Sequence, residues 1–242
     1  MMKPYHQIPI VECGEPLVPI PLDKFGLELP HPYQKLGAPY REASPYYLRQ
    51  TVLAQLTTAQ NYLQEQYPGW RIQIFDAYRP VEVQQFMVDR TFDRVIAAQN
   101  LNPTTLSDAE REAIWQEVYQ LWAVPSLNPL TPPPHSTGAA IDVTLIDATG
   151  YPVDMGSPID ELSPRSHPDY YANCSDQPYH TNRSLLHSVM LAAGFRRNPK
   201  EWWHFSMGDQ MWAWLCNQDN PAQNRTARYG IYSQSQQSIV NS

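Results

Sequence analysis

Two short segments of the sequence carry side chains that could bind a metal ion and activate water. His135 and Asp142 stand at the ends of the stretch HSTGAAID, and Glu201 and His204 stand at the ends of EWWH. Two imidazoles and a carboxylate suit Zn2+, and three protein ligands leave a fourth coordination position for water. Glu201 could then serve as the general base. These residue types predict hydrolysis at a zinc ion held by His135, Asp142 and His204.

The spacing alone leaves a simpler interpretation open, in which His135 is a loop residue and His204 packs in an aromatic core. Asp142 argues against it, because apolar residues flank it on a predicted strand, and a buried carboxylate needs a metal or another cation. Glu201 and His204 differ by three positions, which places them on opposite faces of a regular strand. Glu201 must therefore precede the strand, or a bulge must intervene.

The composition limits the class of protein. The net charge is −7 without any run of Lys or Arg, which disfavours nucleic acid and anionic membrane surfaces as partners. No stretch approaches the roughly 20 apolar residues of a membrane span, and the first residues lack the apolar region of a signal peptide. The three cysteines are too few and too widely spaced for a disulfide framework or a Cys-based zinc site. We expect a cytoplasmic protein that acts on a small polar substrate.

The 242 residues suffice for one domain with a sizeable core. We expect this domain to cover residues 1–216. Nine of the 24 prolines fall in residues 1–45, which predicts an extended segment. Because apolar and aromatic residues also occur there, we expect this segment to be an ordered wrap around the domain. Residues 217–242 are rich in Asn, Gln and Ser and are expected to form a loosely held polar tail.

Periodicity and capping residues place the regular elements. Four helices are expected: from the Ser44-Pro45 cap to Pro68, from Pro80 past Ile96, from the capping box at Ser107 and Glu110 to before Pro125, and over about 181–193. Strands are expected at 71–75, 140–146 and approximately 202–207. This irregular order predicts an α+β fold, with a small, mostly antiparallel central sheet that carries the zinc site and is flanked by helices.

The two metal segments, 135–142 and 201–204, together resemble the zinc signature of the D-alanyl-D-alanine dipeptidases of the VanX type. These belong to the D,D-peptidase and hedgehog-like metallopeptidase group, peptidase family M15. The resemblance extends to DAYRP at 76–80, MGSPID at 155–160 and RSH at 165–167, and covers most of residues 45–207. It implies a hedgehog-like fold and a bacterial metalloprotease that cleaves D-Ala-D-Ala, which removes a cell-wall precursor or recovers D-alanine.

The resemblance also implies roles for individual residues. It implies one Zn2+ per chain on His135, Asp142 and His204, with Glu201 as general base and Arg79 facing the reacting carbonyl, and Asp160, Ser136 and Trp202 as substrate-binding residues. The chain departs from the family pattern at Pro133, where the family usually carries Ser. A hydroxyl and a backbone donor near the substrate are therefore lost.

Two other functions remain open at this stage. One is a D,D-carboxypeptidase that acts on longer muropeptides, which the absence of a signal segment disfavours. The other is a zinc-binding hedgehog-like module without catalysis, which the presence of Glu201 and Arg79 disfavours. No pattern in the sequence indicates the oligomeric state.

Overall fold

The computed structural model describes residues 3–174 and 176–232. The strands in these ranges are β1 (Leu17–Pro19), β2 (Gly26–Leu27), β3 (Tyr47–Arg49), β4 (Arg71–Asp76), β5 (Ala140–Ile146), β6 (Arg196–Arg197) and β7 (His204–Ser206). Five of them form a central sheet in the order β2-β4-β5-β7-β6, and β1 pairs with β3 in a separate ribbon. Only β2 and β4 are parallel, so the predicted mostly antiparallel sheet is confirmed.

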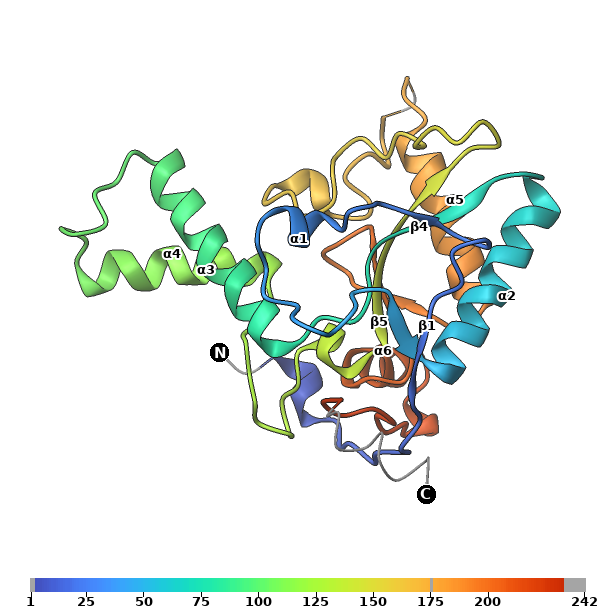
Figure 1. Cartoon of the computed structure of the whole chain (residues 1–242), viewed down its shortest axis with the longest axis horizontal. Helices are drawn as coiled ribbons and strands as arrows, with labels where there is room; N and C mark the ends of the chain where they lie inside the picture. The colour runs from blue at the N-terminus through green and yellow to red at the C-terminus, as the bar shows by residue number, and fades with distance from the viewer. Residues whose placement is uncertain (1–2, 175, 233–242) are drawn as a thin grey trace.

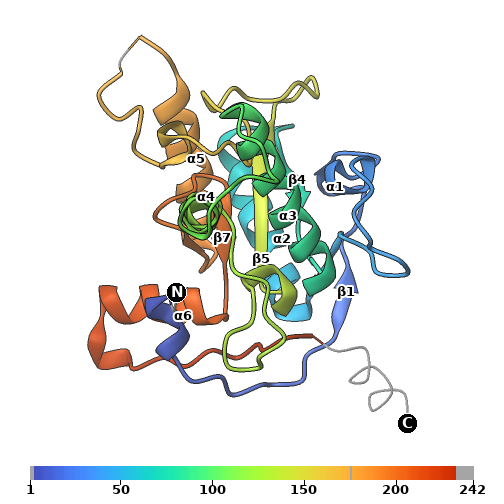
Figure 2. The same ribbon diagram turned by 90° about the vertical axis from the view of Figure 1, so that its left-hand side faces the viewer.

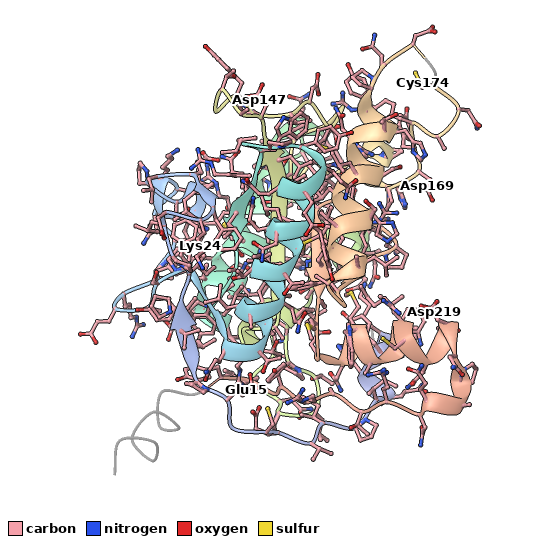
Figure 3. The ribbon with its side chains drawn as sticks, turned by 90° about the vertical axis from the view of Figure 1, so that its right-hand side faces the viewer. Glu15, Lys24, Asp147, Asp169, Cys174 and Asp219 are labelled. Atoms are coloured by element: carbon pink, nitrogen blue, oxygen red, sulfur yellow. The ribbon has the colours of Figure 1, made fainter. Side chains whose placement is uncertain are left out.

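The helices surround this sheet unevenly. They are α1 (Pro32–Lys35), α2 (Gln50–Gln66), α3 (Val81–Ala98), α4 (Asp108–Leu121), α5 (Tyr179–Ala192) and α6 (Gln210–Asp219), with short 3-10 turns η1 (Pro4–Gln7), η2 (Pro134–Thr137), η3 (Pro164–Ser166) and η4 (Pro221–Gln223). α2 and α5 lie side by side over one face of the sheet (Figures 1 and 3), and α3 and α4 form a hairpin that extends away from it (Figure 1). Within the described ranges, no helix combines the length and apolar character that crossing a membrane requires.

The main core lies between the sheet and the helices α2 and α5. On β5, Ile141, Val143 and Leu145 are fully buried and face this core. Burial of each such side chain contributes about 1.5–3 kcal/mol to folding. Because side chains alternate along a strand, Asp142 is turned to the opposite face. The apolar alternation of β5 therefore decides on which face of the sheet a polar site can form.

The second core fills the hairpin of α3 and α4. α3 begins directly after Pro80, as predicted, and buries Val88 against Val118 of α4. The predicted capping box is confirmed, because the Glu110 backbone N–H donates to Ser107 Oγ at 3.3 Å and the Ser107 N–H donates to the Glu110 carboxylate at 2.8 Å. α5 ends two residues before Gly194, also close to its predicted limits.

The predicted start of the first long helix was wrong. The Ser44 Oγ does accept the backbone N–H of Tyr46, at 3.2 Å, but the resulting turn is not continued. Residues 47–49 form β3 instead, in which Leu48 pairs with Val18 and is fully buried. Pairing with a distant segment outweighs the local helix signal, and α2 begins only at Gln50.

A distant residue caps α2 in place of the predicted serine. The N-cap residue Arg49 makes no side-chain capping bond. Glu15, labelled in Figure 3, lies at this end of α2 and accepts the Thr51 backbone N–H at 2.9 Å and the Thr51 hydroxyl at 2.8 Å. Its negative charge also suits the positive end of the helix dipole. The proline-rich segment is thus bound to the domain at specific points.

Several short elements were not predicted, namely β1, β2, β6, α1 and α6. Strands of two or three residues contain too few positions for a periodic pattern. The strand predicted over about 202–207 is shorter, because β7 covers only His204–Ser206. Glu201 therefore precedes the strand, which is one of the two arrangements that allow Glu201 and His204 to reach the same place.

The polar tail predicted after residue 216 is described only to residue 232. The predicted boundary lies within α6, which continues to Asp219. Farther along, Tyr229 and Tyr232 are buried, with their rings 5.2 and 4.9 Å from the Arg49 guanidinium. This part of the segment is packed because its aromatic rings cover a buried cation. Residues 233–242 lie outside the described residues, and the division into domain and tail stays a prediction.

Arg49 connects these outer segments to the domain. Its side chain is fully buried, and its guanidinium donates to the backbone carbonyls of Glu15, Thr137 and Gly230 at 2.6, 2.8 and 3.3 Å. It also pairs with the Glu12 carboxylate at 3.2 Å. The proline-rich segment, the turn before β5 and the C-terminal segment therefore share one buried cation.

We expect Arg49→Met to lower the free energy of unfolding by about 3 kcal/mol, since buried carbonyls lose their donor and Glu12 loses its partner. Arg41→Met is the matched control. Arg41 pairs with Glu82, but both side chains are more than half exposed, so we expect a change within about 0.5 kcal/mol. Urea unfolding followed by tryptophan fluorescence measures both values. Equal effects of the two substitutions would contradict the role given to Arg49.

Candidate active site

Three neighbouring strands bring acidic and imidazole side chains into one row across the sheet. Asp76 of β4 lies opposite Asp142 of β5, and Asp142 lies opposite His204 of β7. The register of β4 shifts at Phe75, which is an extra residue in the ladder. Without this bulge, strict alternation would turn Asp76 to the same face as Ile74, into the apolar core. The bulge therefore brings Asp76 to the face that carries Asp142.

His135 reaches the same place from the turn η2 that precedes β5. Its Nδ1 donates to the Ala77 carbonyl at 2.7 Å, which leaves Nε2 to face the site. Gly138 ends η2 with φ of 71°, in the left-handed region that favours glycine. A Cβ there would lie 2.3 Å from Leu17 Cδ2. Only glycine therefore allows η2 to turn into β5 against the N-terminal segment.

The three predicted metal ligands converge on one point. His135 Nε2 lies 3.1 Å from His204 Nδ1 and 3.2 Å from Asp142 Oδ2, and His204 Nδ1 lies 3.0 Å from Asp142 Oδ1. Tetrahedral zinc with bonds of about 2.0–2.1 Å would place neighbouring ligand atoms about 3.3 Å apart. All three side chains are buried. The donor set and its spacing therefore fit a zinc ion.

The charges in this triangle also call for a cation. His135 donates through Nδ1 to the Ala77 carbonyl, and its Nε2 faces the Asp142 carboxylate. Burial opposes ionisation of Asp142, but the two histidines outweigh it and hold the pKa of Asp142 far below its usual range. Burial likewise opposes protonation of His204, yet its hydrogen bond to Asp142 raises the pKa of His204. A metal ion would supply the positive charge that shared protons otherwise provide.

Arg79 is held rigidly beside the triangle. Its guanidinium lies 5.0 Å from the centres of the Tyr33 and Trp122 rings. Nε donates to Asp76 Oδ2 at 2.9 Å, Nη2 forms an ion pair with the same oxygen at 2.7 Å, and Nη1 donates to Gln84 Oε1 at 2.7 Å. Burial opposes the charge, but Tyr33 and Asp76 hold the pKa of Arg79 above its ordinary value. The cation is therefore permanent and its direction is fixed.

Asp76 orients Arg79 and is itself held from the N-terminal segment. Its Oδ1 accepts the Tyr40 hydroxyl at 3.1 Å and lies 3.0 Å from His31 Nε2. Burial disfavours the carboxylate, but Arg79 and then His31 lower the pKa of Asp76. His31 Nδ1 in turn accepts the Tyr33 backbone N–H at 3.2 Å. These contacts hold Asp76 in place beside Arg79 and make the proline-rich segment part of the site.

Asp160 faces the site from the loop after β5. It adopts φ of 62°, an uncommon conformation for a residue with a side chain and one that often marks functional sites. Its Oδ2 accepts the Tyr33 hydroxyl at 2.6 Å. Burial, together with the nearby Asp142 charge, raises the pKa of Asp160 to about 7. Among the described residues this carboxylate has no ion-pair partner, so a ligand can supply one.

Glu201 stands next to the metal triangle, just before β7. Its side chain is buried, Asn198 Nδ2 donates to its Oε2 at 2.9 Å, and this oxygen lies 3.8 Å from His204 Nδ1. Burial raises the pKa of Glu201 to about 7. A carboxylate with a pKa near neutrality can both accept and return a proton. The position and the pKa therefore suit a general base.

All six of these residues line one cavity of about 410 Å3. They are His135, Asp142, His204, Glu201, Arg79 and Asp160. The remaining wall is largely aromatic and apolar, with contributions from Tyr5, Tyr119, Trp122, Trp203, Met211 and Trp214. A concave, mostly apolar space with a few convergent polar groups is the usual form of a small-molecule site.

Two predicted substrate-binding residues do not line this cavity. Ser136 is buried, and its Oγ donates to the Arg79 carbonyl at 2.7 Å. Trp202 is also buried, and its Nε1 donates to Ser157 Oγ at 3.0 Å while its ring contacts the Arg183 guanidinium at 5.2 Å. Both residues therefore act on their neighbours and do not reach the space that a substrate would fill.

Other contributors to the site were not singled out from the sequence. His31, Tyr33 and Tyr40 were not among the predicted site residues. Their role follows from contacts over more than 30 positions in the chain, which no local pattern shows. Gln84 could have been found from the sequence, because a polar residue on the apolar face of a predicted helix indicates a buried polar partner.

The model of the D-ala-D-ala dipeptidase family, Peptidase M15, matches residues 27–225. A D-alanyl-D-alanine dipeptidase of Synechocystis sp. is 52% identical over 238 residues, which cover 95% of this chain and 96% of that protein. A D-alanyl-D-alanine dipeptidase of Escherichia coli is 42% identical over 73 residues, which cover 30% and 37%.

Among solved structures, a vancomycin-resistance D,D-pentapeptidase in complex with Zn(II) aligns with a TM-score of 0.43 and 15% identity. The alignment covers 84% of this chain and 89% of that one. Within the family match at 27–225 lie all six residues placed around the cavity above. Three other lining residues, Lys3, Pro4 and Tyr5, precede the matched range.

Proposed function

Because this chain belongs to the D-Ala-D-Ala dipeptidase family of metallopeptidases, we propose that it uses zinc to hydrolyse D-Ala-D-Ala with water to two molecules of D-alanine. The observation that carries this proposal is the convergence of three metal-binding atoms, a buried glutamate and a fixed arginine on one cavity. Zinc held by His135, Asp142 and His204 would act as a Lewis acid and lower the pKa of water from about 15.7 towards 7.

Glu201 moves the proton in this mechanism. Its Oε2 lies beside the His204 ligand atom, so it can take a proton from the water that attacks the peptide carbonyl. The same oxygen then returns the proton to the nitrogen of the leaving D-alanine. Asn198 holds the carboxylate in one orientation through both transfers.

Arg79 stabilises the negative charge that develops on the carbonyl oxygen. Asp76 and Gln84 occupy its Nε and Nη1, and its Nη2 lies 3.4 Å from Asp142 Oδ2, at the edge of the metal triangle. A preorganised cation in a site with little water stabilises the transition-state charge more strongly than the same cation in solution. Because it is aligned before the reaction, no reorganisation is needed in the transition state.

Asp160 binds the free amine of the dipeptide. Its raised pKa means that a substrate ammonium completes its ionisation and gains an ion pair. A longer muropeptide has an amide in place of this amine and would leave the carboxylate unpaired. The arrangement therefore favours a dipeptidase over the carboxypeptidase alternative, and the organised pair of Glu201 and Arg79 favours an enzyme over a non-catalytic zinc module.

The first prediction concerns the metal. We expect about one zinc per chain by elemental analysis, loss of this zinc in His204→Ala, and retention in the control His167→Ala, which replaces an exposed histidine. Since zinc binds only the folded site, its removal by chelation should lower the unfolding temperature of the unmodified protein but not that of His204→Ala. Stoichiometric zinc in His204→Ala would refute the ligand assignment.

The second prediction tests the base. Glu201→Gln keeps the shape of the side chain but cannot accept the proton, so we expect zinc to remain while kcat for D-Ala-D-Ala falls by about 10²–10⁴. Glu112→Gln, an exposed position on α4, is the control and should leave kcat unchanged. Release of D-alanine provides the assay. Turnover by Glu201→Gln at the unmodified rate would remove Glu201 from the mechanism.

The third prediction tests recognition of the amine. N-acetyl-D-Ala-D-Ala should have a kcat/KM about 10–100-fold below that of D-Ala-D-Ala, since it loses one charge-assisted interaction and leaves Asp160 unpaired. Asp160→Asn should reduce this difference in kcat/KM, because it weakens the binding of the free dipeptide. Equal cleavage of both peptides by the unmodified protein would refute amine recognition and support the carboxypeptidase alternative.

A further inference from the structure

The cavity carries positive charge that the proposed mechanism does not use. Lys3 and Lys200 both line it, next to the wall that holds Glu201. Neither ammonium forms an ion pair with a carboxylate in the described part of the chain. Lys3 is half-buried, and its Nζ has one hydrogen bond, to the Tyr119 carbonyl at 3.0 Å. Two unpaired cations at an otherwise acidic site need an explanation.

The N-terminal turn η1 holds Lys3 over the cavity. Tyr5 of η1 is buried, and η1 packs against α6 (Figure 2). The Lys3 ammonium donates to the Tyr119 carbonyl near the end of α4. Lys3 therefore spans the space between two helices that are far apart in the sequence. Because its hydrogen bond is to a neutral carbonyl, the charge of Lys3 is available to a ligand.

Lys200 is placed by the same loop that places the base. Its backbone N–H donates to Asn198 Oδ1 at 3.0 Å, and the Nδ2 of this asparagine holds Glu201. Burial and then repulsion by Lys200 lower the pKa of Lys3, whereas Glu201 opposes this shift. The two lysines are thus close enough to repel each other, and an anion between them would relieve this repulsion.

We propose that Lys3 and Lys200 bind the C-terminal carboxylate of the dipeptide; this assignment rests on the proposed function. Each polar group of the substrate then has a partner among the residues that line the cavity. Asp160 meets the amine, Arg79 faces the scissile carbonyl and Glu201 faces the leaving nitrogen. Lys200 directly precedes Glu201, so the carboxylate of the leaving D-alanine lies where the two lysines are.

With this subsite, the enzyme would bind both charged ends of its substrate selectively. A dipeptide with free ends pairs its ammonium with Asp160 and its carboxylate with the lysines. An amide or a further residue at the C-terminal end loses the second pair and leaves cations without a partner. The lysines therefore select a free carboxylate, independently of the selection of a free amine at the other end.

The experiment compares D-Ala-D-Ala with its C-terminal carboxamide in the zinc-loaded protein. In Lys3→Gln/Lys200→Gln we expect the KM for D-Ala-D-Ala to rise about 10–100-fold, with little change in kcat, and the constants for the carboxamide to stay the same. Lys3→Arg, which keeps the charge, should retain most of the preference for the free acid. Lys24→Gln removes a charge from an exposed lysine that does not line the cavity and is the control.

The single variant Lys200→Gln covers the case in which a change at Lys3 disturbs η1, because Lys200 is exposed. It should raise KM for the free acid alone. A double variant that prefers the acid over the carboxamide as strongly as the unmodified protein would overturn the subsite while leaving the proposed function intact. Hydrolysis of neither peptide by the unmodified protein would overturn the proposed function, and this assignment with it.

Discussion

The buried ion pair between Asp76 and Arg79 is the interaction on which the rest of the site depends. Carboxylates surround one cavity, and each must be compensated because water cannot reach them freely. Arg79 compensates Asp76 directly and Asp142 in part, and the two histidines compensate the remaining charge of Asp142. Burial raises the pKa values of Asp160 and Glu201 to about 7, because the nearby cations do not offset it. The same charge balance thus underlies the proposed metal site, base and amine-binding carboxylate.

The N-terminal segment belongs to this balance although it lies outside the central sheet. His31 and Tyr40 fix the second oxygen of Asp76, and Tyr33 lies between Arg79 and Asp160. A proline-rich backbone suits this task. Fixing an extended segment in one conformation costs less conformational entropy when its φ angles are already restricted. Arg49 binds the proline-rich segment at the place where this segment meets the C-terminal segment. Displacing the proline-rich segment would therefore disturb Asp76 and the active site before it disturbed the main core.

What the sequence could predict, and what it could not, follows from the range of the interactions involved. The capping box at Ser107, the helix after Pro80 and the alternation of β5 are set by neighbours a few residues apart, and all three were predicted. The start of α2 and the strands β1 and β3 depend on pairing over about 30 positions, and the local signal at Ser44-Pro45 predicted a helix where β3 forms. Within the site, side-chain chemistry together with family resemblance identified six residues that meet at the cavity. The bulge at Phe75, which decides where Asp76 points, leaves no sequence pattern of its own.

The largely apolar wall of the cavity gives its few charges their selectivity. In water an ion pair is weak, but in a space from which water is displaced, a missing partner costs the full desolvation of the charge that remains. Asp160, Lys3 and Lys200 all line this cavity, so the proposed subsites would together favour a short zwitterion with both ends free. The aromatic rings provide apolar contact area for a ligand and exclude solvent, but they do not distinguish one ligand from another. In the proposed arrangement, the charges at the two ends of the dipeptide would determine which ligand binds, and the metal and Glu201 would act on the ligand held there.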